Sequence, residues 1–223
     1  MTTKIISIEG NIGSGKSTLL ENLRNHYKDD SNIKFVDEPV KDWNNIIDEN
    51  GTTILEKFYA DQLKYSFSFQ IMAYISRLAI LKKTIEENPR SIIISERCLY
   101  TDKEVFAKML FDDKKIELIN YKIYLKWFDT FALEFPIKKV IYVKTSPNIC
   151  FDRIEKRSRT GENNIPLEYL ENCHKYHNNM LDTIKKDCFC NDQLVLNGCV
   201  DIYKNQDQLD IWINQIDEFI HKI

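Results

Sequence analysis

Short apolar segments recur along the chain, and each is followed by a longer stretch in which apolar residues are spaced three or four positions apart. The short segments match buried strands, and the longer stretches match helices that bury one face. Strands that alternate with helices are typical of an α/β fold with a parallel sheet. We predict five strands, over residues 4–8, 33–36, 91–95, 139–143 and 194–196.

No repeat, linker or low-complexity stretch interrupts this pattern, so we predict a single domain over residues 1–223. The longest helical stretch, 54–87, carries apolar residues on several faces and is expected to be buried around much of its circumference. Helices are predicted over 17–27, 54–87, 103–110, 114–133, 147–157, 166–186 and 208–222.

Two polar residues interrupt the 54–87 helix. Gln70 and Arg77 form, with Ala73, an i, i+3, i+7 row on one face of the helix. On so apolar a helix the row indicates the wall of a pocket, and a buried arginine needs an anionic partner. Asp102 is the candidate partner. The alternative is that Arg77 caps its own helix or pairs with Glu86.

A glycine-rich loop lies between the first predicted strand and the first predicted helix. Its backbone N–H groups can curl around a phosphate, Lys16 supplies positive charge, and Ser17 can ligate Mg²⁺ at the helix N-terminus. We therefore predict nucleotide binding. A signalling GTPase is excluded because no N-K-x-D sequence follows a strand. The loop has the pattern G-x-x-x-x-G-K-[ST] and consists of Gly10, Asn11, Ile12, Gly13, Ser14, Gly15, Lys16, Ser17 and Thr18.

Charged residues follow the predicted C-terminal ends of two further strands, Glu38 after the second and Glu96 with Arg97 after the third. Ligands of open α/β sheets bind at this edge. A carboxylate there can accept a hydroxyl proton, and an adjacent arginine can hold both the carboxylate and a transferring phosphoryl group. We predict catalytic roles for Glu38, Arg97 and Lys16. The alternative is a surface salt bridge at the edge of the sheet.

Arginine is scarce in this chain, with 7 Arg against 24 Lys, so its positions are informative. Arg153, Arg157 and Arg159 fall within seven residues, and the first two share one face of a predicted helix. A guanidinium holds phosphate oxygens in a fixed fork, which lysine cannot do. We predict an arginine-rich lid that closes over the donor phosphates. A solvated helix face is the alternative.

Composition narrows the possible partners and location. The chain is 43% hydrophobic and 29% charged, and its apolar stretches are far shorter than the roughly 20 residues that span a bilayer, so no membrane association is expected. The net charge of −3 argues against a nucleic-acid partner. Without a signal peptide, the protein is expected to be intracellular and cytoplasmic, with reduced cysteines. Zinc is disfavoured by the spacing of its possible ligands, Cys173, His174, His177, Cys188 and Cys190.

With these residues identified, the chain resembles the deoxyribonucleoside kinases over nearly its whole length. The resemblance implies a P-loop kinase fold with an arginine-rich lid, ATP or another triphosphate as donor, Mg²⁺ as cofactor, a deoxynucleoside as substrate, and a homodimer. It depends on the order and spacing of GNIGSGKST at 10–18, EPV at 38–40 followed by Trp43, SFSFQ at 66–70, ER at 96–97 and RSRTGENNIPLEYL at 157–170.

The resemblance also implies roles for single residues. Glu38 matches the base that takes the 5′-hydroxyl proton, and Tyr59 with Glu162 matches the pair that holds the sugar 3′-hydroxyl. Gln70 matches the amide that reads the base, and aromatic residues pack around that base. The implied substrate-binding residues are Glu38, Trp43, Tyr59, Phe69, Gln70, Ala73, Arg77, Arg97, Asp102 and Glu162.

Other matches concern the donor side. The resemblance places Glu96 with Ser17 at the magnesium site and the donor base against a loop within 196–204. The three clustered arginines match the lid. The chain departs from the family at Cys98, where many members have serine, so the resemblance does not establish the hydrogen bond that a serine would make there. It also departs at Ser158, where some relatives have glycine.

We predict a deoxynucleoside 5′-kinase that acts on deoxycytidine and purine deoxynucleosides. Asp102 can accept a hydrogen bond from the exocyclic amine of cytosine or adenine, while Arg77 donates to acceptors on the ring. Thymine lacks that amine and adds a methyl group. The alternatives are a thymidine or thymidylate kinase on the same fold and a catalytically silent nucleotide-binding subunit.

Overall fold

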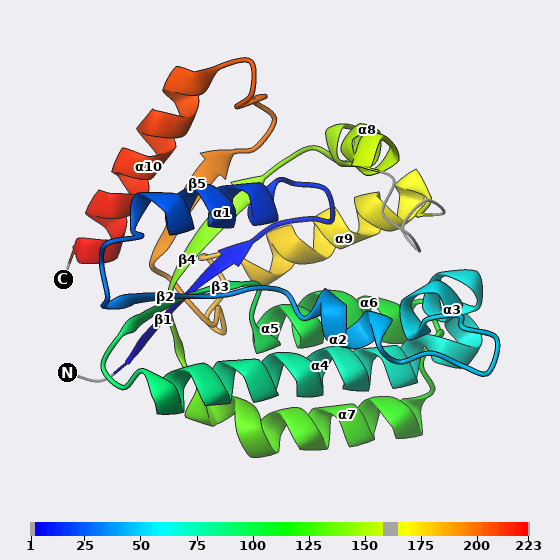
Figure 1. The fold of residues 1–223 in the computed structure, drawn as a ribbon. Coiled ribbons are helices and arrows are strands. Elements are labelled where there is room, and N and C mark those ends of the chain that lie inside the picture. The colour runs from blue at the N-terminus through cyan, green and yellow to red at the C-terminus, as the bar shows by residue number, and fades with distance from the viewer. Residues whose placement is uncertain (1–2, 158–164, 223) are drawn as a thin grey trace.

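A five-stranded parallel sheet forms the centre of the molecule (Figure 1). The computed structural model describes residues 3–157 and 165–222. The strand order is β2-β3-β1-β4-β5, and every neighbouring pair is parallel. The α/β class and all five predicted strands are thereby confirmed. The strands are β1 (Lys4–Glu9), β2 (Ile33–Val36), β3 (Ile92–Glu96), β4 (Ile137–Lys144) and β5 (Gln193–Asn197).

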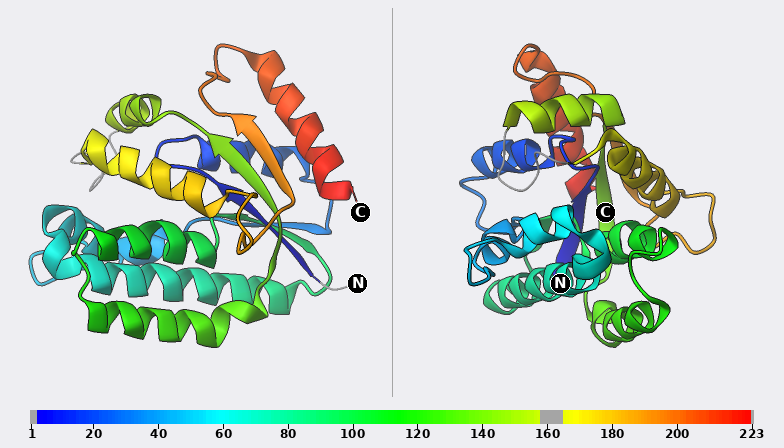
Figure 2. Two further views of the ribbon diagram at one scale, coloured as in Figure 1. Left: turned by 180° about the vertical axis from the view of Figure 1, so that it is seen from behind. Right: turned by 90° about the vertical axis from the view of Figure 1, so that its right-hand side faces the viewer.

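Helices cover both faces of the sheet (Figure 2). On one face α1 (Lys16–His26) and α10 (Gln206–His221) enclose a core that includes Ile8 and Ile216, both fully buried. The larger core on the other face is built from three long helices and the elements between them. These helices are α4 (Gln62–Glu87), α7 (Leu118–Phe131) and α9 (Leu167–Met180).

The central strand β1 contributes to both cores because its side chains alternate between the two faces. Ile6 and Ile8 point into the α1 core, whereas Ile5 belongs to the α4 core. The same alternation directs Ser7 and Glu9 toward the α4 side, and both are fully buried. Two polar side chains therefore enter the interior at the end of β1 that leads into the P-loop.

The single helix predicted over 54–87 is wrong, because the chain forms α3 (Ile54–Ala60) and α4 with a break at Asp61. Asp61 has φ −146° and ψ 84°, outside the helical region, and its carboxylate accepts a hydrogen bond from the Lys64 backbone N–H at 3.1 Å. A carboxylate in this position caps the start of a new helix. The local cap outweighs the continuous apolar spacing.

Three other predicted boundaries differ from the structure. The helix predicted over 166–186 ends at Met180, since the Asp182 side chain accepts the Ile184 backbone N–H at 3.1 Å and so favours a turn. The helix predicted over 114–133 begins at Leu118, and the one over 103–110 is part of a longer region with a π-helical turn. Helix α8 (Pro147–Arg157) has the predicted bounds, and α2 (Val40–Asn44) was not predicted. The described residues also form α5 (Leu99–Thr101), the π turn (Asp102–Ala107), α6 (Lys108–Asp112) and a 3₁₀ turn (Ala132–Glu134).

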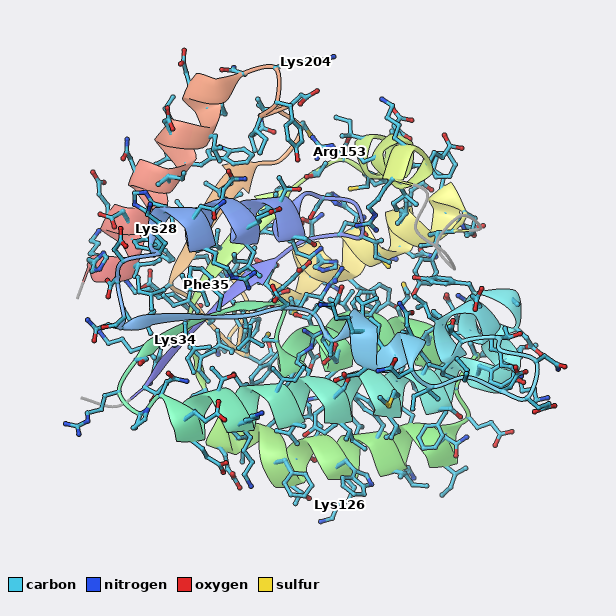
Figure 3. All side chains as sticks on the ribbon, in the orientation of Figure 1. Lys28, Lys34, Phe35, Lys126, Arg153 and Lys204 are labelled. Carbon is cyan, nitrogen blue, oxygen red and sulfur yellow. The ribbon has the colours of Figure 1, made fainter. Side chains whose placement is uncertain are left out.

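Arg77 and Arg97 lie in a different environment from the surface lysines. Lys28, Lys126 and Lys204 are exposed and point away from the molecule (Figure 3), whereas Arg77 and Arg97 are buried. Burying a guanidinium requires partners, so these two arginines mark a polar site inside the fold. Within the described ranges, no helix is both long enough and apolar enough to cross a membrane.

Candidate active site

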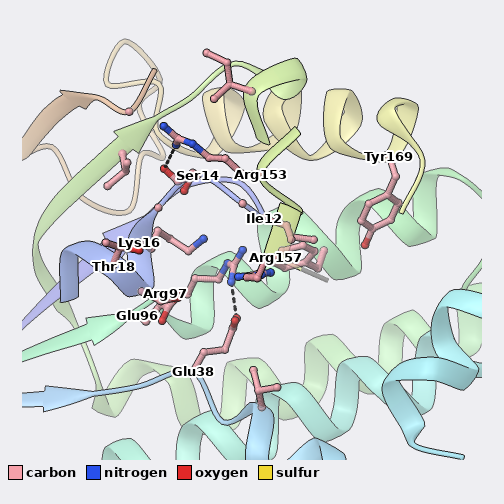
Figure 4. Close-up of a pocket in the computed structure, with 18 of the residues that line it drawn as sticks. Ile12, Ser14, Lys16, Thr18, Glu38, Glu96, Arg97, Arg153, Arg157 and Tyr169 are labelled. Carbon is pink, nitrogen blue, oxygen red and sulfur yellow. Dashed lines mark hydrogen bonds and ion pairs between the residues drawn. The ribbon is translucent and has the colours of Figure 1, made fainter. Parts of the chain in front are cut away.

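A cavity of about 600 Å³ lies at the C-terminal edge of the sheet, where the P-loop, α4, α8 and the loop after β5 meet (Figure 4). Of the predicted site residues that the structure describes, all but Gly10 and Asn11 line this cavity. Arg159 and Glu162 lie outside the described residues. One cavity thus brings together residues predicted separately for the donor and for the acceptor.

The P-loop forms one end of the cavity. Gly13 has φ +77°, and a Cβ there would lie 2.6 Å from the Cys150 carbonyl oxygen, so the loop needs glycine at this point. Lys16 Nζ donates to the Asn11 carbonyl oxygen at 2.7 Å. Burial and the positive charge of Arg97 lower the pKa of Lys16 to about 8, although nearby carboxylates oppose the change.

Two oxygen-bearing side chains meet beside the P-loop, because Ser17 Oγ donates to Glu96 Oε1 at 2.8 Å. A hydroxyl and a carboxylate are ligand types that Mg²⁺ takes, so the pair fits a magnesium ion shared with donor phosphates. Elsewhere in the described ranges, no group of three or more His, Cys, Asp or Glu side chains gathers at a point that could hold a metal. His177, one of the possible zinc ligands, has Nδ1 within 2.7 Å of the Cys173 carbonyl oxygen.

The buried Arg97 forms an ion pair with Glu38, whose side chain is 15% exposed (Figure 4). Arg97 Nη1 donates to Glu38 Oε1 at 2.5 Å, and Arg77 Nη2 lies 3.4 Å from the same oxygen. Burial opposes the ionisation of Glu38, but the charges of Arg97, Arg77 and Lys16 outweigh it and lower the pKa of Glu38 to about 2. The carboxylate is therefore ionised at neutral pH and able to accept a proton. Arg97 Nε is buried without a hydrogen-bond partner among the described residues, which leaves a donor available.

The predicted partnership of Arg77 with Asp102 is present. Arg77 Nε and Nη2 donate to the two Asp102 carboxylate oxygens at 2.8 and 3.3 Å, and both side chains are 3% exposed. Arg77 Nη1 donates to the Glu96 carbonyl oxygen at 2.6 Å, which ties the pair to the end of β3. Because the Arg77 guanidinium donates to these three oxygens, its plane is fixed within the cavity wall.

Aromatic side chains enclose the part of the cavity beside α4. Trp43 meets Phe69 edge-on with ring centroids 5.3 Å apart, and Phe58 stacks on Phe69 at 4.7 Å. The Gln70 amide oxygen is buried here, with no hydrogen-bond partner in the described part of the chain. Sequence reasoning missed Phe58 and Phe106, which also line the cavity. Phe106 follows the predicted aspartate by one helical turn, and that spacing was the available signal.

Arg153 does not point freely into the cavity. Its Nη1 donates to the Ser14 carbonyl oxygen at 3.1 Å and its Nη2 to the Val200 carbonyl oxygen at 3.3 Å, so it links the P-loop to the loop after β5. Arg157, the last residue of α8, is exposed and lines the same cavity. Residues 198–203 line the cavity too, within the range expected for the donor base.

A phosphate cradle that shares one cavity with a buried carboxylate and arginines defines a P-loop phosphotransferase. The chain belongs to the deoxynucleoside kinase family, whose sequence model matches residues 6–221. The resemblance found in the motifs is thereby confirmed, and the enzyme is an ATP-dependent phosphotransferase that acts on deoxynucleosides.

Individual relatives match over most of their length. A probable deoxycytidine kinase of Fowlpox virus is 32% identical over 225 residues, covering 100% of this chain and 90% of the relative. Deoxycytidine kinase of Homo sapiens is 33% identical over 198 residues, or 80% of this chain and 75% of the relative. Mitochondrial deoxyguanosine kinase of Xenopus laevis is 31% identical over 199 residues, or 81% of this chain and 74% of the relative.

Proposed function

We propose that the enzyme transfers the γ-phosphoryl group of ATP, or of another nucleoside triphosphate, to the 5′-hydroxyl of deoxycytidine and purine deoxynucleosides. The observation that carries this preference is the buried pair of Arg77 and Asp102, which lines the cavity together with the Gln70 amide. The names of the deoxycytidine and deoxyguanosine kinase relatives support it. The enzyme would act inside the cell, where its triphosphate donor is found.

The chemistry of the pair favours bases with an amino group. A carboxylate has about four lone-pair positions, so Asp102 can accept from an exocyclic amine while it accepts from Arg77. Arg77 is held as a donor toward the ring acceptors of the base. Thymine presents a carbonyl where cytosine presents the amine and adds a methyl group, which makes thymidine the poorer substrate.

The catalytic groups divide the work of phosphoryl transfer. As the 5′-oxygen attacks the γ-phosphorus, Glu38 accepts the hydroxyl proton, and the bond from phosphorus to the bridging β–γ oxygen breaks. Arg97 orients Glu38 and donates to the transferring group, and Lys16 binds the donor phosphates. Ser17 and Glu96 would hold Mg²⁺, which neutralises phosphate charge when bound.

Two further groups complete the proposed site. Tyr59, which lines the cavity, holds the sugar 3′-hydroxyl together with Glu162. Arg153 exchanges its carbonyl partners for donor phosphates, and Arg157 and Arg159 close over the same phosphates. Charge-assisted bonds to phosphate are stronger than bonds to neutral carbonyls, which favours the exchange when the donor binds.

We propose a homodimer that forms through α4 and α7. These helices expose several large apolar side chains, among them Ile75 at 42%, Ile119 at 62% and Trp127 at 45%. Such a patch marks an interaction surface. Sedimentation velocity of the wild type should give twice the chain mass of 26.5 kDa, and Ile123→Glu should give the single-chain mass. A wild type that sediments as a monomer would refute the dimer.

A coupled kinase assay tests the substrate assignment. The panel contains the four deoxynucleosides and thymidine monophosphate, each with ATP and Mg²⁺. We expect efficient turnover of deoxycytidine and of a purine deoxynucleoside, and poor turnover of thymidine. A preference for thymidine or its monophosphate over every amino-bearing deoxynucleoside would overturn the assignment.

A further inference from the structure

Arg97 has a left-handed backbone with φ +61°, a conformation that is unfavourable for a residue with a side chain. Such a conformation persists only where the surrounding structure fixes it. The Arg97 guanidinium is buried and reaches Glu38, so the backbone conformation determines whether the two groups meet. The bonds that hold this backbone therefore matter for the site.

On the sheet side, two hydrogen bonds hold the Arg97 backbone directly. Its backbone N–H donates to the Ile8 carbonyl oxygen at 3.0 Å, which extends the pairing of β3 with β1. Its carbonyl oxygen accepts a hydrogen bond from Ser95 Oγ at 2.9 Å. Both partners belong to central strands, so this side of the turn is rigid.

On the helix side, Thr101 holds the chain through Glu9. Thr101 Oγ1 donates to Glu9 Oε2 at 2.6 Å, and Ser7 Oγ donates to the other Glu9 oxygen at 2.5 Å. Thr101 and Glu9 are both 0% exposed, so bulk water cannot replace their bond. Cys98 begins α5 without a side-chain capping bond, and its Sγ, a weak partner, lies 3.5 Å from Thr101 Oγ1. The bond from Thr101 to Glu9 is thus the strong connection between α5 and β1.

We propose that Thr101 and Glu9 are positioning residues that tether the start of α5 to β1 and thereby hold Arg97 against Glu38. Neither tether residue lines the cavity, so neither touches a substrate. Because Asp102 follows Thr101 directly, the same tether fixes the place from which the Arg77 partner projects. The expected effect of losing the tether on turnover rests on the proposed function of Arg97. The expected displacement of the Arg97 side chain does not rest on that function.

Three substitutions test the tether. Thr101→Val keeps the shape of the side chain and removes its hydroxyl, and Thr101→Ser restores the hydroxyl. Thr84→Val is the matched control, since it removes a hydroxyl that donates to the Ile80 carbonyl oxygen at 2.8 Å on α4, away from the cavity. Each protein is assayed for kcat and for the KM of ATP, and the Glu38 carboxyl is titrated by ¹³C NMR.

For Thr101→Val we expect kcat to fall on the order of 10- to 100-fold, the effect of a misplaced catalytic group, with little change in the KM of ATP. The pKa of Glu38 should rise from about 2 toward its ordinary value, because Arg97 no longer lies beside it. Thr101→Ser and Thr84→Val should behave like the wild type.

The two readouts separate the possible failures. An unchanged Glu38 pKa in folded Thr101→Val protein overturns the tether, whatever happens to kcat. A raised Glu38 pKa with unchanged kcat supports the tether and removes Arg97 from the proposed mechanism. If Thr101→Val does not fold, Ser7→Ala is used instead, because it removes the hydrogen bond to one oxygen of Glu9. The pKa of Glu38 should then rise by less than is expected for Thr101→Val. A Glu38 pKa that does not rise in Ser7→Ala overturns the proposal.

Discussion

Replacing Glu38 with glutamine removes one charge from the buried centre of the site while keeping the side-chain shape. Arg97 loses the carboxylate 2.5 Å away, whereas Arg77 keeps Asp102 at 2.8 Å. The folded protein lowers the pKa of Glu38 from 4.5 to about 2, which corresponds to about 3 kcal/mol in favour of the ionised form. At pH 7 we therefore expect Glu38→Gln to lower the free energy of unfolding by up to about 3 kcal/mol. We expect kcat to fall by about 10²- to 10⁴-fold, the contribution of a positioned general base.

The assay compares kcat at saturating ATP and deoxycytidine with the free energy of unfolding from urea denaturation. Asp37→Asn is the control, because Asp37 is the neighbouring carboxylate and its ion pair with Arg24, at 2.8 Å, is exposed to solvent. Such a surface pair contributes less than about 1 kcal/mol and should leave kcat unchanged. Folded Glu38→Gln enzyme with kcat within about tenfold of the wild type would assign the proton to another acceptor, since a general base contributes at least about 10²-fold.

The same pKa sets a pH window for stability. Because the folded pKa of Glu38 is lower than the unfolded one, its contribution is complete above pH 4.5 and is lost as the pH falls toward about 2. The difference in unfolding free energy between the wild type and Glu38→Gln should thus be constant from neutral pH to about pH 5 and shrink below it. A difference that already declines between pH 7 and 5 would contradict a strongly lowered pKa.

Three other changes test separate parts of the site. Arg77→Met combined with Asp102→Ala should raise kcat/KM for thymidine relative to deoxycytidine, and an unchanged ratio would remove the pair from base selection. A 2′,3′-dideoxynucleoside should be a much poorer substrate than its 3′-hydroxyl counterpart, since the proposed bond from the 3′-hydroxyl to Tyr59 could not form; equal efficiency would contradict this contact. Gly198→Ala places a Cβ where it overlaps the Thr145 hydroxyl, so thermal denaturation should show a loss of about 1–3 kcal/mol and the KM of ATP should rise. Wild-type stability and KM would show that the loop after β5 adjusts freely.

Local patterns in the sequence predicted the strands, the P-loop and the row on α4, because each depends on residues close together in the chain. The pairing of Arg77 with Asp102 was also predictable, since a buried arginine requires a carboxylate and few were near a strand end. The break at Asp61 was not, because apolar spacing continues across it and the outcome depends on a single capping side chain.

Contacts between segments that are distant in the sequence could not be predicted either. The bonds of Arg153 to the Ser14 and Val200 carbonyl oxygens depend on how α8 meets two loops. Every residue has a backbone carbonyl, so the sequence does not indicate which carbonyl a side chain will bind. The bond from Thr101 to Glu9 joins positions 92 residues apart, and the two residues are not part of one recognisable motif.

Both cores of the sheet supply side chains that line the cavity. Trp212 and Ile202, on α10 and the loop after β5, belong to the core beneath α1 and α10, whereas Phe69 and Ala73 belong to the core beneath α4. A substitution on α4 can therefore reshape the cavity wall around Phe69 while the packing under the loop after β5 stays as it was. The wall beside α4 and the loop after β5 can thus be varied one at a time, because each is packed against a different side of the sheet.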